Sequence, residues 1–242
     1  MPIGVRRRDV SRAVRSDFTT LREGSLHAAL KARYAAIVAG ARVEAVVDGF
    51  VVDVAGRDEL VEVQTTSFAS ARRKLERLVA SHRVLLVHPI PVEKWLVTVD
   101  ADGAVVRRRR SPKRGLGLDL FDELVSIPAL VAHSNFRIEV ALTSEEEVRG
   151  PIPDGARYRY PRTWWRLDRR LLDVVDTRRI DTPADLLWLL PPGLPEPFTT
   201  ADIVAATGRS KRLAMRAVYC LERSGAIARL ARRGRLTTYG RG

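Results

Sequence analysis

The residues best suited to chemistry are two acids in the Val-rich stretch 46–64. Asp48 ends a first apolar segment, and Glu62 opens the triplet Glu62-Val63-Gln64 in a second one. Carboxylates in such apolar segments are costly to bury without a partner. Mg²⁺ binds proteins through one or two carboxylates, and waters and phosphate oxygens complete its octahedron. The pattern predicts a site for Mg²⁺ or Mn²⁺ held by Asp48 and Glu62, with the backbone carbonyl of Val63 as a further ligand.

The periodicity of a strand indicates which polar neighbours share the face of this expected site. Side chains alternate with a period of two, so Gln64 is expected on the face that carries Glu62. Asp53 and Asp48 are an odd number of positions apart, and regular alternation places them on opposite faces. We therefore expect Asp53 to be a structural residue near the turn. Glu44 is an even number of positions from Asp48, so it is expected on the same face and is a further candidate for the site.

A metal held by these acids would suit the hydrolysis of phosphodiester bonds. The reaction needs an ion that activates water and neutralises the charge of the transition state. Gln64 is expected to position the water, and Lys74 or Lys31 to supply an ammonium group that stabilises charge. Arg73 is a weaker candidate, because a group that is always protonated does not act as a base.

The composition indicates a nucleic-acid partner. The 242 residues include 42 Lys and Arg against 29 Asp and Glu, and the formal net charge is +13. A basic surplus of this size is typical of proteins that bind polyanions, most often nucleic acids. The chain has no apolar run of about 18 residues and no secretory signal, so no membrane partner is expected. The lone Cys220 forms no internal disulfide, which fits a cytoplasmic, nucleoid-associated protein.

A regular succession of elements surrounds the two acids. A helix is expected over 26–40, strands over 43–47, 50–54 and 60–64, a second helix over 68–81, and a buried strand over 84–88 that Pro89 ends. Further strands are expected at 95–99, 104–106 and 136–142, with a helix over 118–132. The first six elements have the order α-β-β-β-α-β.

The last 45 residues read as a separate unit after the Pro-rich segment LLPPGLPEPF. A short helix from Thr199, a turn at Gly208, a longer helix from Ser210 and a two-stranded hairpin follow one another. Between residues 201 and 242 there are ten Lys and Arg and two acids. This unit resembles the winged helix-turn-helix family.

That resemblance implies a helix in the major groove of DNA and a hairpin on the backbone or minor groove. The basic residues in these positions are Arg209, Lys211, Arg212 and Arg216 on the helix, with Arg232 and Arg233 at the hairpin tip. A protein-binding module with a solvated basic face is the open alternative.

A second basic stretch is the tract RRRRSPKR at 107–114. Its six basic residues are Arg107, Arg108, Arg109, Arg110, Lys113 and Arg114. The tract either grips phosphates or is a solvated loop, and its position after an expected strand favours nucleic-acid contact. Trp164 and Trp165 either stack on bases or pack in the interior.

The elements around the acids resemble the PD-(D/E)xK nuclease superfamily. The resemblance rests on the helix SLHAALKARY, the strand ending in Asp48, the Glu-Val-Gln triplet, the next helix and the strand VLLVH. It covers residues 23–90, with the strands to about 142 as additions. It implies the restriction-endonuclease-like fold, an α/β architecture with a mixed sheet flanked by helices.

The resemblance also implies roles for individual residues. Asp48 and Glu62 take the positions of the metal ligands, and Gln64 takes the position usually held by a lysine. Glu23 is the candidate for an acid that often joins such sites from the first helix. His27 either flanks the site or packs in the core.

The expected protein has four parts: a basic arm at 1–22, a nuclease domain at 23–145, a helical connector with a Pro-rich linker at 146–197, and a winged helix at 198–242. Its expected function is that of a Mg²⁺-dependent endonuclease, a hydrolase that cleaves double-stranded DNA. Two alternatives stay open: an inactive DNA-binding regulator that uses the first domain as a scaffold, and a nuclease that acts on RNA. A homodimer is also left open.

Overall fold

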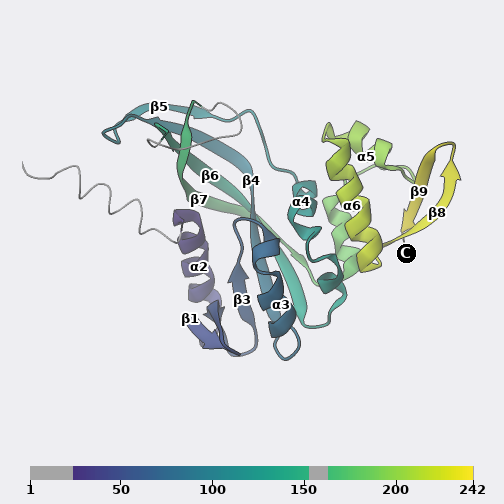
Figure 1. Cartoon of the computed structure of the whole chain (residues 1–242), viewed down its shortest axis with the longest axis horizontal. Helices are drawn as coiled ribbons and strands as arrows, with labels where there is room; N and C mark the ends of the chain where they lie inside the picture. Colours follow the sequence, from purple (N-terminus) through teal and green to yellow (C-terminus); the bar gives the residue numbers. More distant parts are fainter. Residues whose placement is uncertain (1–23, 153–162, 242) are drawn as a thin grey trace, which may run out of the picture.

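The structure is a computed structural model that describes residues 24–152 and 163–241 (Figure 1). Its α-helices are α2 (Ser25–Ile37), α3 (Arg72–Leu78), α4 (Phe121–Leu124), α5 (Thr200–Thr207) and α6 (Lys211–Ser224). Short 3₁₀ helices are η1 (Phe68–Ser70), η2 (Gly117–Leu120), η3 (Pro128–Ala132) and η4 (Pro183–Leu189). In these described residues no helix is long and apolar enough to cross a bilayer.

Seven strands form one mixed sheet in the order β1-β2-β3-β4-β6-β7, with β5 paired to β4. They are β1 (Arg42–Val47), β2 (Phe50–Ala55), β3 (Leu60–Val63), β4 (Val84–Val99), β5 (Val105–Arg110), β6 (Phe136–Gly150) and β7 (Trp165–Ile180). β4 runs parallel to β3 and β6, and the other pairs in the sheet are antiparallel. The predicted order α-β-β-β-α-β at the start of the chain is confirmed, and so is the mixed α/β class.

Helices cover both faces of the sheet because its central strands bury apolar residues on both sides. On one face, α2 packs Leu26, Leu30 and Tyr34 against Val61 and other residues of the central strands. On the other face, a larger cluster joins the sheet to η1, α3 and α4. The short strand β3 is buried along its whole length, so any polar side chain on it must find a partner inside the protein.

The strand at Val84 does not end at Pro89, as the sequence suggested, but continues to Val99. Proline lacks a ladder donor and is tolerated where one edge of a strand is unpaired. The pairing of β3 with β4 stops at Val87, and that of β5 with β4 starts at Trp95. Pro89 and Pro91 lie in the interval where β4 pairs with β6 alone.

The basic tract also differs from its expected loop form. Its first four arginines, residues 107–110, belong to β5, because the long β4 offers them an antiparallel partner. All four are exposed. Arg108 pairs with Glu146 and Arg110 with Glu93, so this edge of the sheet is basic but partly neutralised. The expected helix 118–132 is broken into η2, α4 and η3.

The C-terminal unit contains α5, α6 and the hairpin β8 (Ile227–Arg233) with β9 (Leu236–Arg241). A capping box of Thr199 and Asp202 begins α5, and Ser210 caps α6. Gly225 ends α6 with a φ of 86°, a conformation that favours glycine.

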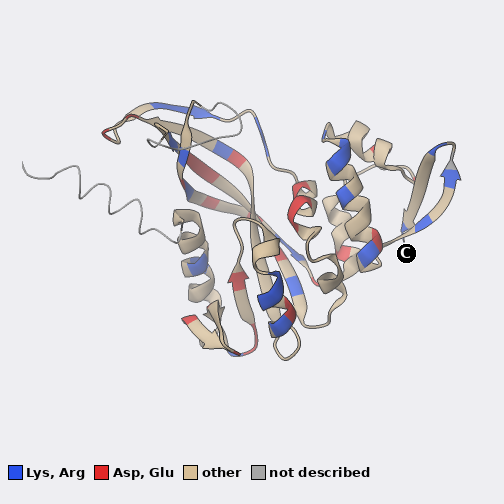
Figure 2. Ribbon diagram, in the orientation of Figure 1, with Lys and Arg blue, Asp and Glu red and all other residues tan. Residues whose placement is uncertain are grey.

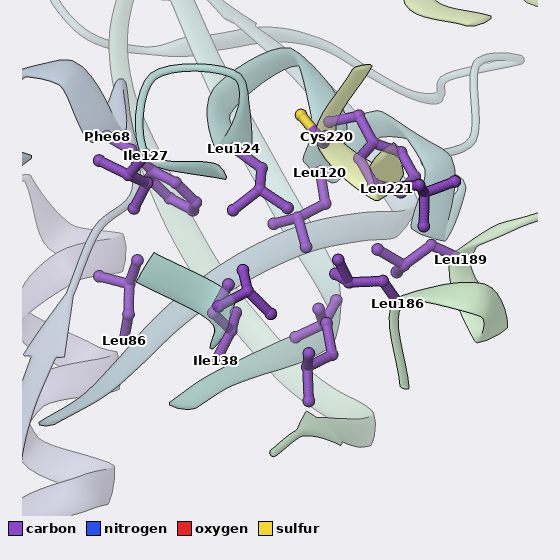
Figure 3. Packing of buried hydrophobic residues seen from close by; sticks show 14 of the residues in the cluster. Phe68, Leu86, Leu120, Leu124, Ile127, Ile138, Leu186, Leu189, Cys220 and Leu221 are labelled. Carbon is purple, nitrogen blue, oxygen red and sulfur yellow. The ribbon is translucent and has the colours of Figure 1, made fainter. Parts of the chain in front are cut away.

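This unit packs on the rest of the protein through one continuous apolar cluster. Figure 3 shows this cluster around Leu120 and Leu124, near Leu186 and Leu189 of η4, with Leu221 of α6. A domain boundary at residue 198 stays a prediction.

A substitution that leaves a cavity in this shared core tests how strongly the sheet and the C-terminal unit are coupled during unfolding. Leu221→Ala is expected to lower the free energy of unfolding by about 2–5 kcal/mol, within a single cooperative transition. Urea unfolding followed by circular dichroism and by tryptophan fluorescence measures both quantities. Met215→Ala on the exposed side of α6 is the control and should change stability by no more than about 0.5 kcal/mol. Two separate transitions, with only one moved by Leu221→Ala, would show that the C-terminal unit folds independently.

Candidate active site

Two acids come together where β2 and β3 pair. In the antiparallel register Val54 lies opposite Val61 and Ala55 opposite Leu60. One step further along, Asp53 Oδ2 accepts a hydrogen bond of 2.8 Å from the backbone N–H of Val63. The carboxylate of Asp53 therefore lies beside the Glu-Val-Gln triplet.

Glu62 is the buried acid of this pair, with 6% of its surface exposed. Its Oε1 lies 2.5 Å from Nζ of Lys74, and the same ammonium donates to the carbonyl of Val51. Burial raises the pKa of Glu62 to about 7, and the negative charge of Asp53 adds to the rise, while Lys74 opposes it. Near neutral pH the carboxyl group is therefore poised between its acid and base forms.

Asp53 responds in the opposite direction. Burial alone would raise its pKa, but hydrogen bonds from His27 and from the N–H of Val63, with the charge of Lys74, hold the pKa below its ordinary value. His27 Nε2 lies 3.2 Å from Asp53 Oδ2. Two adjacent carboxyl groups whose pKa values are driven apart are typical of catalytic and metal sites, although structural ion pairs also produce them.

The structure does not bring Asp48 to Glu62, which corrects the expected pairing. Asp48 lies in the β1–β2 turn with a φ of 48°, and its Oδ2 is 2.9 Å from Nε2 of His82. The parity argument assumed a regular hairpin. Glu44, which falls opposite Asp53 in the register, has a φ of 53° and interrupts the alternation. Asp53, which was expected to be structural, is instead the carboxylate beside the triplet.

The other expected site residues have diverse surroundings. Lys31 is buried and lies 2.7 Å from Oε1 of Glu44. Gln64 donates its amide hydrogens to the carbonyl of Ser67 and to Oγ of Ser70. The side chain of Val63 packs on the face covered by α2. Glu23 lies outside the described residues.

A cavity of about 480 Å³ opens beside Asp53. The segments around it are the start of α2, the hairpin β1–β2, the residues after β3, and β7. Its polar and charged lining residues are His27, Lys31, Glu44, Asp53, Gln64, Thr65, Thr66, Arg166, Asp168 and Arg169.

Two buried contacts hold the backbone after β3. Arg169 pairs with Glu145, whose surface is fully buried, and donates to the carbonyl of Thr65 at 3.1 Å. His88 Nδ1 lies 2.6 Å from the carbonyl of Gln64. Burial lowers the pKa of His88 to about 4, so this histidine is neutral at physiological pH and can donate through Nδ1.

The expected DNA-binding residues in and just before α6 divide into two groups. Arg209 binds Asp119 at 2.7 Å and Arg216 binds Asp122 at 2.6 Å, so both pair with acids of the same chain. The physical reason is that α6 packs against η2, which carries Asp119, and against α4, which carries Asp122. Figure 2 shows the acids of α4 beside α6.

Most of the remaining candidates are exposed. Lys211 and Arg212 are exposed at the start of α6, and Arg232 is exposed on β8. Arg233 pairs with Leu236 in the hairpin. Lys113 and Arg114 follow β5 and are exposed, and Arg114 accepts a hydrogen bond from Arg209 through its carbonyl.

The donor set at Asp53 and Glu62 suits a hard cation. In the described part of the chain no three His, Cys, Asp or Glu residues converge as a ready metal cluster. Mg²⁺ does not need such a cluster, because one or two carboxylates with waters and substrate phosphates suffice. The pair therefore fits a metal that binds together with a phosphate-bearing substrate.

Comparison with known proteins covers most of the chain. The family described as "Domain of unknown function (DUF8091)" matches residues 24–181, from the start of α2 to the residue after β7. A protein of Treponema pallidum (strain Nichols), described as uncharacterized, is 30% identical over 223 residues, which are 91% of this chain and 86% of that protein. No solved structure matches the chain.

The raised pKa of Glu62 predicts a specific dependence of stability on pH. The folded value of about 7 exceeds the ordinary value of 4.5, so the folded protein holds this proton more tightly. The stabilisation is complete below pH 4.5 and is lost as pH rises to about 7, with an upper limit of roughly 3 kcal/mol.

Glu62→Gln should remove this component, so the stability of the variant should rise relative to wild type between pH 4.5 and 7. Urea unfolding across that range measures the difference in the free energy of unfolding. The lost contact with Lys74 lowers the stability of the variant equally at each pH, so it does not change the slope of stability against pH. Parallel pH profiles for the two proteins would contradict the assignment.

Proposed function

The chain belongs to the DUF8091 family, and for this member we propose the function of a metal-dependent nuclease that hydrolyses phosphodiester bonds in DNA. The observation that supports it most is the buried Glu62, which contacts Lys74 and lies next to Asp53, an acid that lines a cavity. The proposed architecture is the restriction-endonuclease-like fold, which agrees with a short buried β3 between an antiparallel and a parallel neighbour.

Asp53 and Glu62 would hold Mg²⁺ or Mn²⁺, with the carbonyl of Val63 as a further oxygen ligand. A metal bound there would supply an activated water and neutralise charge on the phosphate. Lys74 would stabilise the negative charge that develops in the transition state, because its ammonium already reaches the carboxylate.

Gln64 has a defined part in this proposal. Its Nε2 donates to the carbonyl of Ser67 at 2.7 Å and to Ser70 Oγ at 2.8 Å, so both amide hydrogens are engaged. This fixes the orientation of the amide and leaves Oε1 as an acceptor. Gln64 can therefore orient a water molecule without acting as a base or a cation.

DNA would be held by the basic surfaces outside the site. The helices α5 and α6, the turn at Gly208 and the hairpin β8–β9 fit a winged helix-turn-helix unit in their order. Lys211 and Arg212 would lead the contact with duplex DNA, because Arg209 and Arg216 are occupied by acids. We place the protein in the cytoplasm, at the nucleoid.

A DNA-binding regulator without catalysis is the second candidate. It is favoured by the ion pair between Lys74 and Glu62, because the ammonium occupies a carboxylate that a metal would need. Under this alternative the pair would be structural, and DNA binding would not depend on metal.

Cleavage assays separate the two candidates. With plasmid and linear DNA in Mg²⁺ or Mn²⁺, Asp53→Asn and Glu62→Gln should each lower the cleavage rate by about 100-fold or more, because loss of a metal ligand removes several kcal/mol of stabilisation at about 1.4 kcal/mol per tenfold. EDTA should abolish cleavage by the wild type.

Asp48→Asn is the matched control, since it removes one nearby carboxylate that does not contact the site. It should retain wild-type activity. A wild-type protein that binds DNA but does not cleave it would support the regulator. Loss of activity in Asp48→Asn alone would indicate that the active site includes Asp48, in the β1–β2 turn, and not Asp53 and Glu62. RNA substrates in the same assay test the RNA alternative.

Metal binding should depend on pH through Glu62. The carboxyl group must lose its proton to bind a cation, and its pKa is about 7. The Mn²⁺ dissociation constant, measured by electron paramagnetic resonance without DNA, should rise toward about tenfold per pH unit below pH 7. Asp48→Asn should show the same profile. An affinity that is constant from pH 5.5 to pH 8 would contradict this role.

A further inference from the structure

The cavity beside Asp53 has the size of a single nucleotide. Its volume of about 480 Å³ lies in the range of pockets that enclose small molecules. A DNA duplex, whose major groove alone is about 12 Å wide, does not enter such a space. The lining includes the first turn of α2 on one side and residues 166–169 of β7 on another.

Among the described residues, each charged side chain that lines the cavity has an ion-pair or hydrogen-bond partner, except Arg166. Glu44 pairs with Lys31, and Asp168 accepts hydrogen bonds from the backbone and hydroxyl of Ser25. Arg169 is bound to the buried Glu145. Arg166 is exposed, and in the described ranges 24–152 and 163–241 no carboxylate lies within ion-pair distance of it. A guanidinium in this condition suits a phosphate, which it can bind with two hydrogen bonds.

Aromatic side chains continue the cavity on the far side of Arg166. A second hollow of about 290 Å³ is lined by Glu147, Trp164, Trp165 and Arg166, so Arg166 belongs to both hollows. Trp165 is 37% exposed. Trp164 has the guanidinium of Arg149 3.7 Å from its ring centroid. Exposed aromatic rings beside a cation are the means by which proteins hold unpaired bases and the phosphates between them.

We propose that these two hollows seat an unpaired stretch of the strand to be cleaved, with the phosphate between two nucleotides on Arg166 and a base against Trp165. The inference rests on the proposed nuclease function and narrows its substrate to DNA that has a single-stranded segment. Duplex DNA bound elsewhere on the basic surface would present such a segment at a tail, gap or junction.

Binding to a short single strand tests this seat without catalysis. The full-length protein in EDTA is titrated with a fluorescent five-nucleotide thymidine strand, and anisotropy gives the dissociation constant. Arg166→Gln should weaken binding by about tenfold, the value of one charge-assisted contact. It should also reduce the slope of log affinity against log salt by about 0.7, because one phosphate contact is lost. Trp165→Leu should weaken binding with no change in that slope.

Arg77→Gln is the matched control. Arg77 is an exposed arginine on α3, which covers the opposite face of the sheet from α2, and its loss changes the net charge by the same amount. It should leave single-strand binding within about twofold of wild type. Equal weakening by Arg166→Gln and Arg77→Gln would overturn the seat, because only general charge would then be at work.

Cleavage identifies the substrate. Three DNAs of one sequence are compared: a blunt duplex, the same duplex with a single-stranded tail, and the single strand alone. Cuts in or at the edge of the tail, slowed by Arg166→Gln, support the inference. A blunt duplex cut as fast as the tailed one overturns it while leaving the nuclease function intact. If the protein cuts none of the three DNAs but binds the single strand through Arg166, the result supports the binding site and contradicts the proposed nuclease function.

Discussion

The burial of one carboxyl group, that of Glu62, is the constraint on which the arrangement of the site depends. Its charged form is costly inside the sheet, and the rise of its pKa to about 7 expresses that cost. Lys74 offsets part of the penalty from α3, while Asp53 increases it from β2. The charge of two neighbouring acids is relieved here in part by Lys74 and, near neutral pH, by protonation of Glu62.

The surrounding fold keeps this arrangement in place from both faces of the sheet. α2 contributes His27 on the side of the cavity, and α3 contributes Lys74 on the other side. The backbone after β3 is held by His88 and by Arg169, whose own partner Glu145 is fully buried. The site therefore depends on β4, β6 and β7 as well as on the short strands that carry its acids.

Local sequence patterns were sufficient for the first half of the sheet and for the proximity of Lys74 to Glu62. The hydrophobic periodicity located α2, β1, β2, β3 and α3, and Glu62 and Lys74 were both expected near the site. The position of Asp53 was misjudged, because the parity rule requires a regular strand and the left-handed backbone at Glu44 breaks that regularity. The register could have indicated it, since Asp53 falls next after the pairs Val54–Val61 and Ala55–Leu60.

Such local patterns do not indicate which strands and side chains far apart in the sequence lie next to each other. β7 mixes charged and apolar residues without a regular period and is mostly exposed. Nothing local therefore indicates that Arg166 and Arg169 reach residues about a hundred positions earlier in the chain. Pro89 was predicted to end the strand at Val84, because the sequence does not show that one edge of β4 is unpaired there. Arg209 and Arg216 were assigned to DNA because the acids that bind them, Asp119 of η2 and Asp122 of α4, are close only in space.

The single apolar cluster that joins the sheet to α6 has a consequence for how this protein can change during evolution. A module on a flexible tether is easily exchanged for another, because nothing else must adjust. Here, removal of α6 would expose Leu120, Leu124 and Leu186 to water, so its loss would have to be matched by changes in the partner surface. The sheet and its C-terminal unit are therefore expected to be inherited together, which agrees with a relative that aligns over 91% of the chain.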